Sequence, residues 1–124
     1  MKTKNILTTF ITLIIAVNVF AQTTIRTQKA IGGNSTDWFT SMDLTSDGGM
    51  IVGGTSYSGI SGEKTEAVKG GTSSDYWVVK LDSVGLLQWQ QSFGGSAADV
   101  ANSVLQTNDG GYIVAGRSVS RVSV

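Results

Sequence analysis

Short stretches of alternating apolar and polar residues run through this chain, and turn residues separate them. Such alternation, rich in β-branched and aromatic residues, is typical of β-strands. Six runs of seven or eight residues fit it: 38–45, 50–56, 76–82, 86–93, 100–107 and 112–118. Asp47-Gly48 and Asp109-Gly110 each separate two of these runs, and Asp-Gly is a strong hairpin signal. The pattern therefore predicts an all-β chain.

The third and fourth runs carry the largest apolar side chains. Trp77, Val79 and Leu81 are expected on one face of the third, and Leu87, Trp89 and Phe93 on one face of the fourth. Before them lies 57–74, a loop rich in Gly, Ser and Thr, whose charged residues 63–69 we expect to be solvated.

An internal repeat is the strongest signal in the sequence. Residues 31–58 and 93–120 align without a gap at an offset of 62, and 13 of the 28 pairs are identical. The Asp-Gly-Gly turn and the Ile-Val pair that follows it stay in register. We therefore expect a first repeat at 31–92 and the start of a second at 93–124.

A repeated antiparallel unit of four strands is what a β-propeller blade requires. The region 22–124 is expected to hold about one and a half blades. Two strands of the second unit would then be missing, so we expect a truncated fragment that packs on missing blades of a longer chain.

The N-terminal segment 1–21 has the pattern of a secretory signal peptide. Lys2 and Lys4 precede the apolar stretch 6–20, and small or medium residues lead up to a cleavage site before Gln22. A transmembrane anchor is the alternative, but the apolar stretch is shorter than the roughly 20 residues that a span needs. We expect a secreted or cell-surface protein with no membrane span after cleavage.

Composition removes several kinds of chemistry. Lys plus Arg equals Asp plus Glu at nine each, so no excess of positive charge favours nucleic acid as a partner. The chain has no Cys and no His, which excludes thiolate nucleophiles and imidazole bases. Serines are abundant, but only Lys could serve as a base to activate one, and no Ser-x-x-Lys stands before a predicted helix. We expect no enzyme activity, no metal and no cofactor.

The carboxylates and aromatic residues have structural interpretations. Asp37 and Asp99 occupy one repeat position after a Gly-Gly pair, and we expect each to accept backbone N–H bonds in a turn. The Asp-Gly-Gly sequences lack the ligand spacing of a calcium loop and are expected to be plain turns. Most aromatic residues are expected in the core. Tyr76 lies off the Trp77 face and is the one weak candidate for contact with a ligand.

A family resemblance appears in the run DYWVVKLDSVGLLQWQQSFGGSAADVANSVLQTNDGGYIVAG. It resembles repeats of large secreted proteins of Bacteroidetes-type bacteria. It is also similar to the bacterial β-propeller repeat family, whose pattern is GGS, Asp, an apolar strand, an Asp-Gly turn and an aromatic-led strand ending in Gly. The resemblance covers roughly residues 25 to 120. It implies a propeller-like fold, no defined enzymatic activity and, for many members, a C-terminal sorting domain, which these residues do not contain.

Three functions stay open at this point. The first is a non-catalytic scaffold or interaction module with a protein or glycan partner. The second is a carbohydrate-binding module that uses exposed aromatic side chains such as Tyr76. The third is part of a larger secreted enzyme whose site lies on missing blades.

Overall fold

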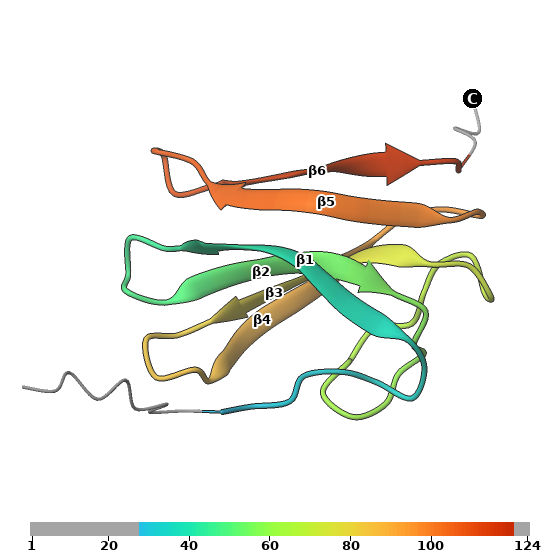
Figure 1. Cartoon of the computed structure of the whole chain (residues 1–124), viewed down its shortest axis with the longest axis horizontal. Helices are drawn as coiled ribbons and strands as arrows, with labels where there is room; N and C mark the ends of the chain where they lie inside the picture. Colours follow the sequence, from blue (N-terminus) through green and yellow to red (C-terminus); the bar gives the residue numbers. More distant parts are fainter. Residues whose placement is uncertain (1–27, 121–124) are drawn as a thin grey trace, which may run out of the picture.

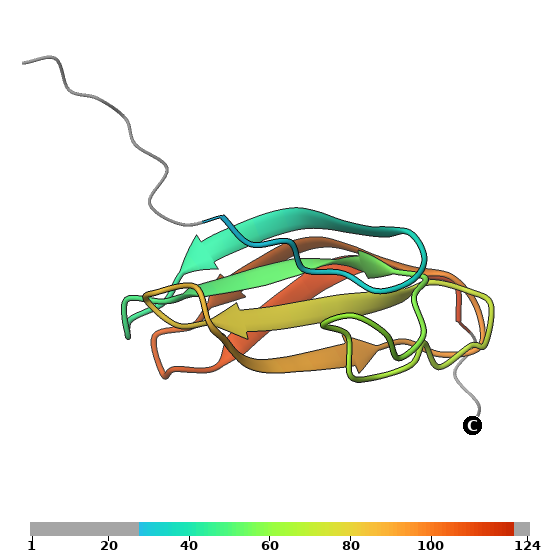
Figure 2. The ribbon, with the colours of Figure 1, turned by 90° about the horizontal axis from the view of Figure 1, so that it is seen from below.

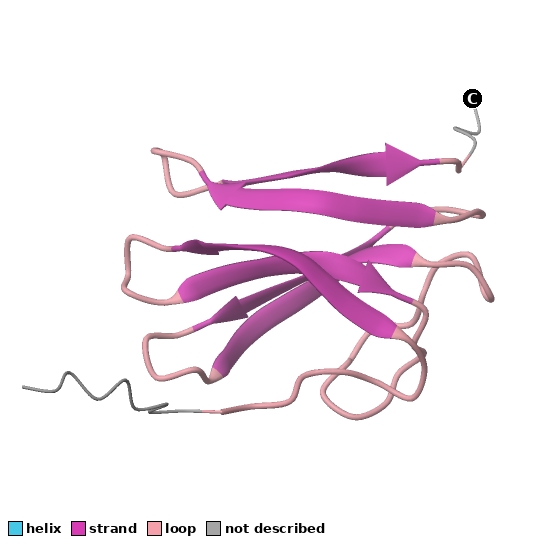
Figure 3. Cartoon of the chain, in the orientation of Figure 1, coloured by secondary structure: helices cyan, strands magenta, loops and turns pink. Residues whose placement is uncertain are grey.

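Every regular element among residues 28–120 is a β-strand (Figures 1 and 3). The computed structural model describes residues 28–120, so the predicted signal peptide at 1–21 lies outside the described residues. The strands are β1 (Asp37–Leu44), β2 (Met50–Ser56), β3 (Asp75–Leu81), β4 (Leu87–Phe93), β5 (Asp99–Gln106) and β6 (Tyr112–Ser118). Each bound lies within one residue of the predicted run, which confirms the all-β prediction. Residues 28–120 contain no helix able to cross a membrane.

The strands form two antiparallel sheets. The larger has the order β1-β2-β3-β4, and β5 pairs with β6 in the smaller. The β5–β6 hairpin lies over one face of the larger sheet, and Figure 2 shows it behind the strands of that sheet (Figures 1 and 2). β5 contacts β1, β2 and β3. The described residues therefore make a two-layered β-structure.

The two Asp-Gly-Gly turns have the same geometry. Gly48 and Gly110 have φ angles of 78° and 88°, in the left-handed region that glycine adopts without strain. In the first turn the Thr45 N–H donates to the Gly49 carbonyl at 3.0 Å, and in the second the Thr107 N–H donates to the Gly111 carbonyl at 2.9 Å. The prediction of two hairpins at these turns is confirmed.

Side chains of the larger sheet alternate between two faces. The Val78 face, which β5–β6 covers, contains Ile51, Thr55 and Val78. The opposite Trp77 face holds a second apolar cluster of Trp77, Val79 and Leu81, as predicted. Each face thus has its own small core.

The prediction that Leu87 shares a face of β4 with Trp89 and Phe93 is wrong. A register shift in the β3–β4 ladder falls between Lys80 and Leu81. As a result Leu87 packs against the Trp77 cluster, whereas the Trp89 ring meets Tyr112 of β6 on the other side. A bulge changes which face a side chain points to, and alternation alone does not reveal it.

The loop 57–74 folds against β4, so the prediction that its charged residues 63–69 are solvated is wrong in part. Glu66 accepts the N–H of Ser92 at 2.7 Å, and the Lys64 ammonium donates to the Ser92 hydroxyl at 2.6 Å. Lys64 is buried, and its ammonium lies 5.0 Å from the centre of the Trp77 ring. These contacts cover an edge strand that would otherwise offer free backbone groups.

Candidate functional site

The contact between β5–β6 and the larger sheet is the most developed site in the described chain. Its centre is an apolar cluster of three buried residues, Ile51, Val78 and Val104. Tyr112 and Val114 of β6 pack against this cluster from the side of the hairpin. Burial of such side chains supplies the main driving force for holding two layers together.

Polar side chains of β1 and β2 bind the backbone of β5. The Thr40 hydroxyl donates to the Ala101 carbonyl at 2.8 Å, and Thr55 Oγ1 accepts the Ala101 N–H at 3.1 Å. The Ser41 hydroxyl accepts the N–H of Val104 at 3.2 Å. These bonds satisfy backbone groups of β5 that β6 leaves free. The sequence pattern did not predict these bonds, although serine stands at the same repeat position in both units, as Ser41 and Ser103.

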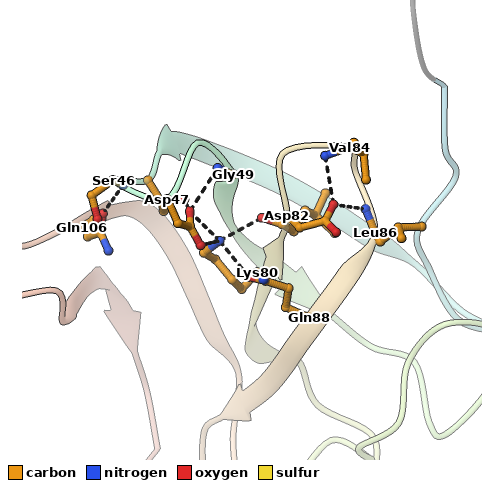
Figure 4. A network of polar contacts seen from close by, with 11 residues as sticks. Ser46, Asp47, Gly49, Lys80, Asp82, Val84, Leu86, Gln88 and Gln106 are labelled. Atoms are coloured by element: carbon orange, nitrogen blue, oxygen red, sulfur yellow. Dashed lines mark hydrogen bonds and ion pairs between the residues drawn. The ribbon is translucent and has the colours of Figure 1, made fainter.

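Two further bonds extend this contact along β5 toward the turn. Asp43 Oδ2 accepts the N–H of Gln106 at 3.1 Å. The side-chain carbonyl of Gln106 in turn accepts the N–H of Ser46, at 2.7 Å (Figure 4). The hairpin is therefore fixed both at its middle and at its turn end.

Tyr76, the predicted ligand contact, is half-buried in this interface. A Cβ built on Gly116 of β6 would lie 2.8 Å from the Tyr76 hydroxyl, so the phenol reaches β6. Burial raises the pKa of Tyr76, and the Asp99 carboxylate adds to this effect. Its expected exposure is thus corrected, while contact with a ligand stays a prediction.

Asp37 and Asp99 make the same bonds. Each accepts the N–H of the glycine four residues before it and the hydroxyl of the serine 21 residues after it, at 2.7 Å in both bonds of Asp37 and 2.9 Å in both of Asp99. Burial alone would raise the pKa of each carboxyl, but the Ser56 and Ser118 hydroxyls and these bonds lower it. The predicted structural role in a turn is confirmed.

Asp75 is a buried carboxylate that the sequence did not single out. Its Oδ2 accepts the N–H of Lys69 at 2.6 Å, and its Oδ1 has no hydrogen-bond partner among the described residues. Burial raises the pKa of Asp75, and the nearby Asp99 carboxylate adds to it. A Cβ on Gly94 would collide with Asp75 Oδ1 and lie 2.7 Å from Asp99 Oδ2, so Gly94 fills the space between them.

A lysine holds the first Asp-Gly-Gly turn (Figure 4). The buried ammonium of Lys80 donates to Asp47 Oδ2, Gln88 Oε1 and the Leu81 carbonyl, each at 2.9 Å. The Thr45 hydroxyl, followed by Lys80, lowers the pKa of Asp47 below its ordinary value. This network holds the β1–β2 turn against the end of β3, so Lys80 has a structural role.

Two aromatic rings are open to solvent on β1 and just after β2. Trp38 and Tyr57 are 41% and 39% exposed, and their centroids lie 5.8 Å apart at a tilt of 52°. Trp77 is buried as predicted, but Trp38 and Trp89 are exposed, against the expectation that most aromatic residues lie in the core. An exposed aromatic pair of this kind has the chemistry to stack on a sugar ring.

A shallow depression of about 290 Å³ lies on the outer side of the β1–β2 hairpin. Phe39, Thr40, Ser41, Met42 and Val52 line it, and the Met42 side chain is well exposed. Within residues 28–120, no three acidic side chains come together to hold a metal ion. The predicted absence of a metal or a cofactor stays a prediction.

Comparison with known proteins gives no family for this chain. No protein-family model matches it, and neither a curated protein nor a solved structure matches it significantly.

Proposed function

We propose that the chain is an exported, non-catalytic segment of a β-propeller that acts as a scaffold or interaction module. In this proposal β1–β4 form one blade and β5–β6 begin the next. The observation that carries it is the face-to-face stacking of β5–β6 on the Val78 face, through an apolar centre and bonds from Thr40, Ser41 and Thr55. Repeated units that bury their faces against each other are typical of such architectures.

Apolar residues on the outer sides of the stack support the scaffold role. Met42 and Leu44 of β1 are exposed on one side, as is Ile113 of β6 on the other. Exposed apolar surface of this kind marks a place where a protein partner packs. In the proposed architecture, further repeat units, of a longer chain or of a second copy, cover these surfaces.

Export is tested by the mature N-terminus. Mass spectrometry of the protein recovered from the medium or the cell surface should find Gln22 as its first residue. An intact Met1 in the membrane fraction would contradict the proposed export.

The exposed pair Trp38 and Tyr57 favours a carbohydrate-binding module as the second candidate. A glycan array with the wild type, Trp38→Ala and Tyr57→Ala separates the two functions. Phe93→Ala is the matched control, because Phe93 is also an exposed aromatic on a strand. A scaffold role with a protein partner predicts no saturable glycan binding by any of them. Binding that is lost with Trp38→Ala and kept with Phe93→Ala would overturn it.

A further inference from the structure

The two hairpins use opposite sides of equivalent structures. β5–β6 contacts the larger sheet through Val104 and Val114. At the offset of 62 residues, these correspond to Met42 and Val52, which lie in the depression on the outer side of β1–β2. The surface that is buried in the second hairpin is therefore open in the first.

The complementary surface is open at the other end of the stack. Ile51 fills the apolar cluster between the layers, and its equivalent on β6, Ile113, is 54% exposed. Ser41, which binds the backbone of β5, corresponds to Ser103, which is also exposed. Each chain thus presents both halves of the contact that it already makes internally.

One pair of facing positions is polar in the internal contact and apolar on both open surfaces. Inside the chain, Asp43 meets Gln106 through a hydrogen bond. The equivalents of these two residues are Leu105 and Leu44, which are 42% and 72% exposed. If two copies docked as β5–β6 docks inside the chain, Leu105 of one copy would face Leu44 of the other. The polar pair of the internal contact is thus replaced by an apolar pair, whose members can pack against each other.

We propose that a second copy of this chain docks head to tail, with its outer β5–β6 surface on the open side of β1–β2. Ile113 of one copy then fills the depression beside Met42 and Val52 of its neighbour. Ser103 binds the backbone at Met42, as Ser41 binds it at Val104. Ala115 stands where the internal contact has Gly53, at which a Cβ would lie 2.9 Å from the Val104 Cβ, so the two copies sit farther apart where Ala115 meets Met42. Arg117 replaces Thr55, so the bond that Thr55 makes to the Ala101 N–H has no equivalent. The proposal rests on the stacking role proposed above and names a partner for it.

The contact uses two different surfaces, so it is heterologous. Such contacts leave one free surface at each end and add copies, to a closed ring where the rotation allows it and otherwise to an open filament. A substitution on either surface should therefore stop growth on that side only. This asymmetry separates head-to-tail docking from a symmetric dimer and from aggregation.

Sedimentation velocity of the secreted mature protein over a wide concentration range tests the proposal. The wild type should at least double its mass as concentration rises. Met42→Arg and Ile113→Arg should each remain monomeric, whereas Ile60→Arg, an exposed loop control, should associate like the wild type. An equal mixture of Met42→Arg and Ile113→Arg should form a dimer and nothing larger, because one intact surface remains on each.

Three results would overturn the proposal: a monomeric wild type, undiminished association of either arginine variant, or a monomeric mixture. Circular dichroism and thermal unfolding check that the variants fold, and Met42→Gln with Ile113→Gln replaces any that do not. A monomeric wild type leaves the scaffold role intact, since blades in the same chain can cover these surfaces. Glycan binding through Trp38 would instead overturn the scaffold role and leave this mass measurement readable.

Discussion

The hairpins β1–β2 and β5–β6 have the same backbone design but different surroundings. Both contain a bulge at the same position, between Phe39 and Ser41 in one and between Ala101 and Ser103 in the other. Yet most of β2 is buried, whereas most of β6 is exposed. β2 has β3 beside it and β5 on its face. Local bonds thus fix the shape of a hairpin, and neighbouring strands decide what it buries.

The two turns show the same contrast in polar chemistry. In each, the carboxylate accepts a bond from the threonine two residues before it and from the glycine N–H two residues after it. Only Asp47 also meets a lysine among the described residues, because Lys80 comes from the neighbouring β3. Asp109 remains exposed.

The largest difference between the hairpins should appear at the equivalent isoleucines. Ile51→Ala leaves a cavity in the core between the layers and should cost about 2–5 kcal/mol. Ile113→Ala changes an exposed side chain and should cost no more than about 0.5 kcal/mol. Urea unfolding of dilute protein measures both. Equal costs would show that the environments do not differ.

Valine in the two turns should give similar, intermediate losses. Gly48→Val and Gly110→Val force a β-branched residue to a positive φ and should each cost about 1–3 kcal/mol. No atom lies within 3.4 Å of a Cβ at either position, so the cost is conformational. Thermal unfolding of both variants measures these losses. A loss of stability in only one variant would contradict a shared turn geometry.

Removing the charge of the turn carboxylate should affect the two hairpins differently, by a few degrees in Tm. Asp47→Asn weakens the bonds to Lys80 and should lower Tm more than Asp109→Asn does. The folded state lowers the pKa of Asp47, so its ionised form stabilises the protein above the ordinary value of 3.8. The deficit of Asp47→Asn should therefore be largest at neutral pH and should shrink as pH falls below that value. A deficit that grows in acid would contradict this account.

The smallest effect is expected at Asp75, where the sign reverses. Folding raises the pKa of this carboxyl, so its ionised form opposes folding above the raised value. Asp75→Asn should leave Tm unchanged or raise it slightly at neutral pH and lose this advantage in acid. Melting curves from neutral to acidic pH measure it. A large drop in Tm at neutral pH would show that the charge stabilises the fold.

The sequence predicted what depends on local pattern. Alternation placed every strand within one residue, and Asp-Gly placed both turns, because these features depend on neighbouring residues alone. It did not predict that Lys64 is buried against Trp77 or that Tyr76 points toward β6. Both outcomes depend on how a loop and a second sheet pack on the first, and no periodicity encodes that packing.

The central claim is that β5–β6 stacks on the Val78 face through side chains of β1 and β2. Hydrogen exchange of dilute, monomeric protein tests it most directly. The amides of Ala101, Val104 and Gln106 donate to Thr55, Ser41 and Asp43. Their counterparts 62 residues earlier have no such side-chain acceptor among the described residues.

These three amides of β5 should exchange at least roughly tenfold more slowly than their counterparts in β1. The comparison is internal, because the two hairpins share their bulge and register. Slow exchange confined to the β5 amides would support the stacking. Equal exchange rates in the two sets would contradict it.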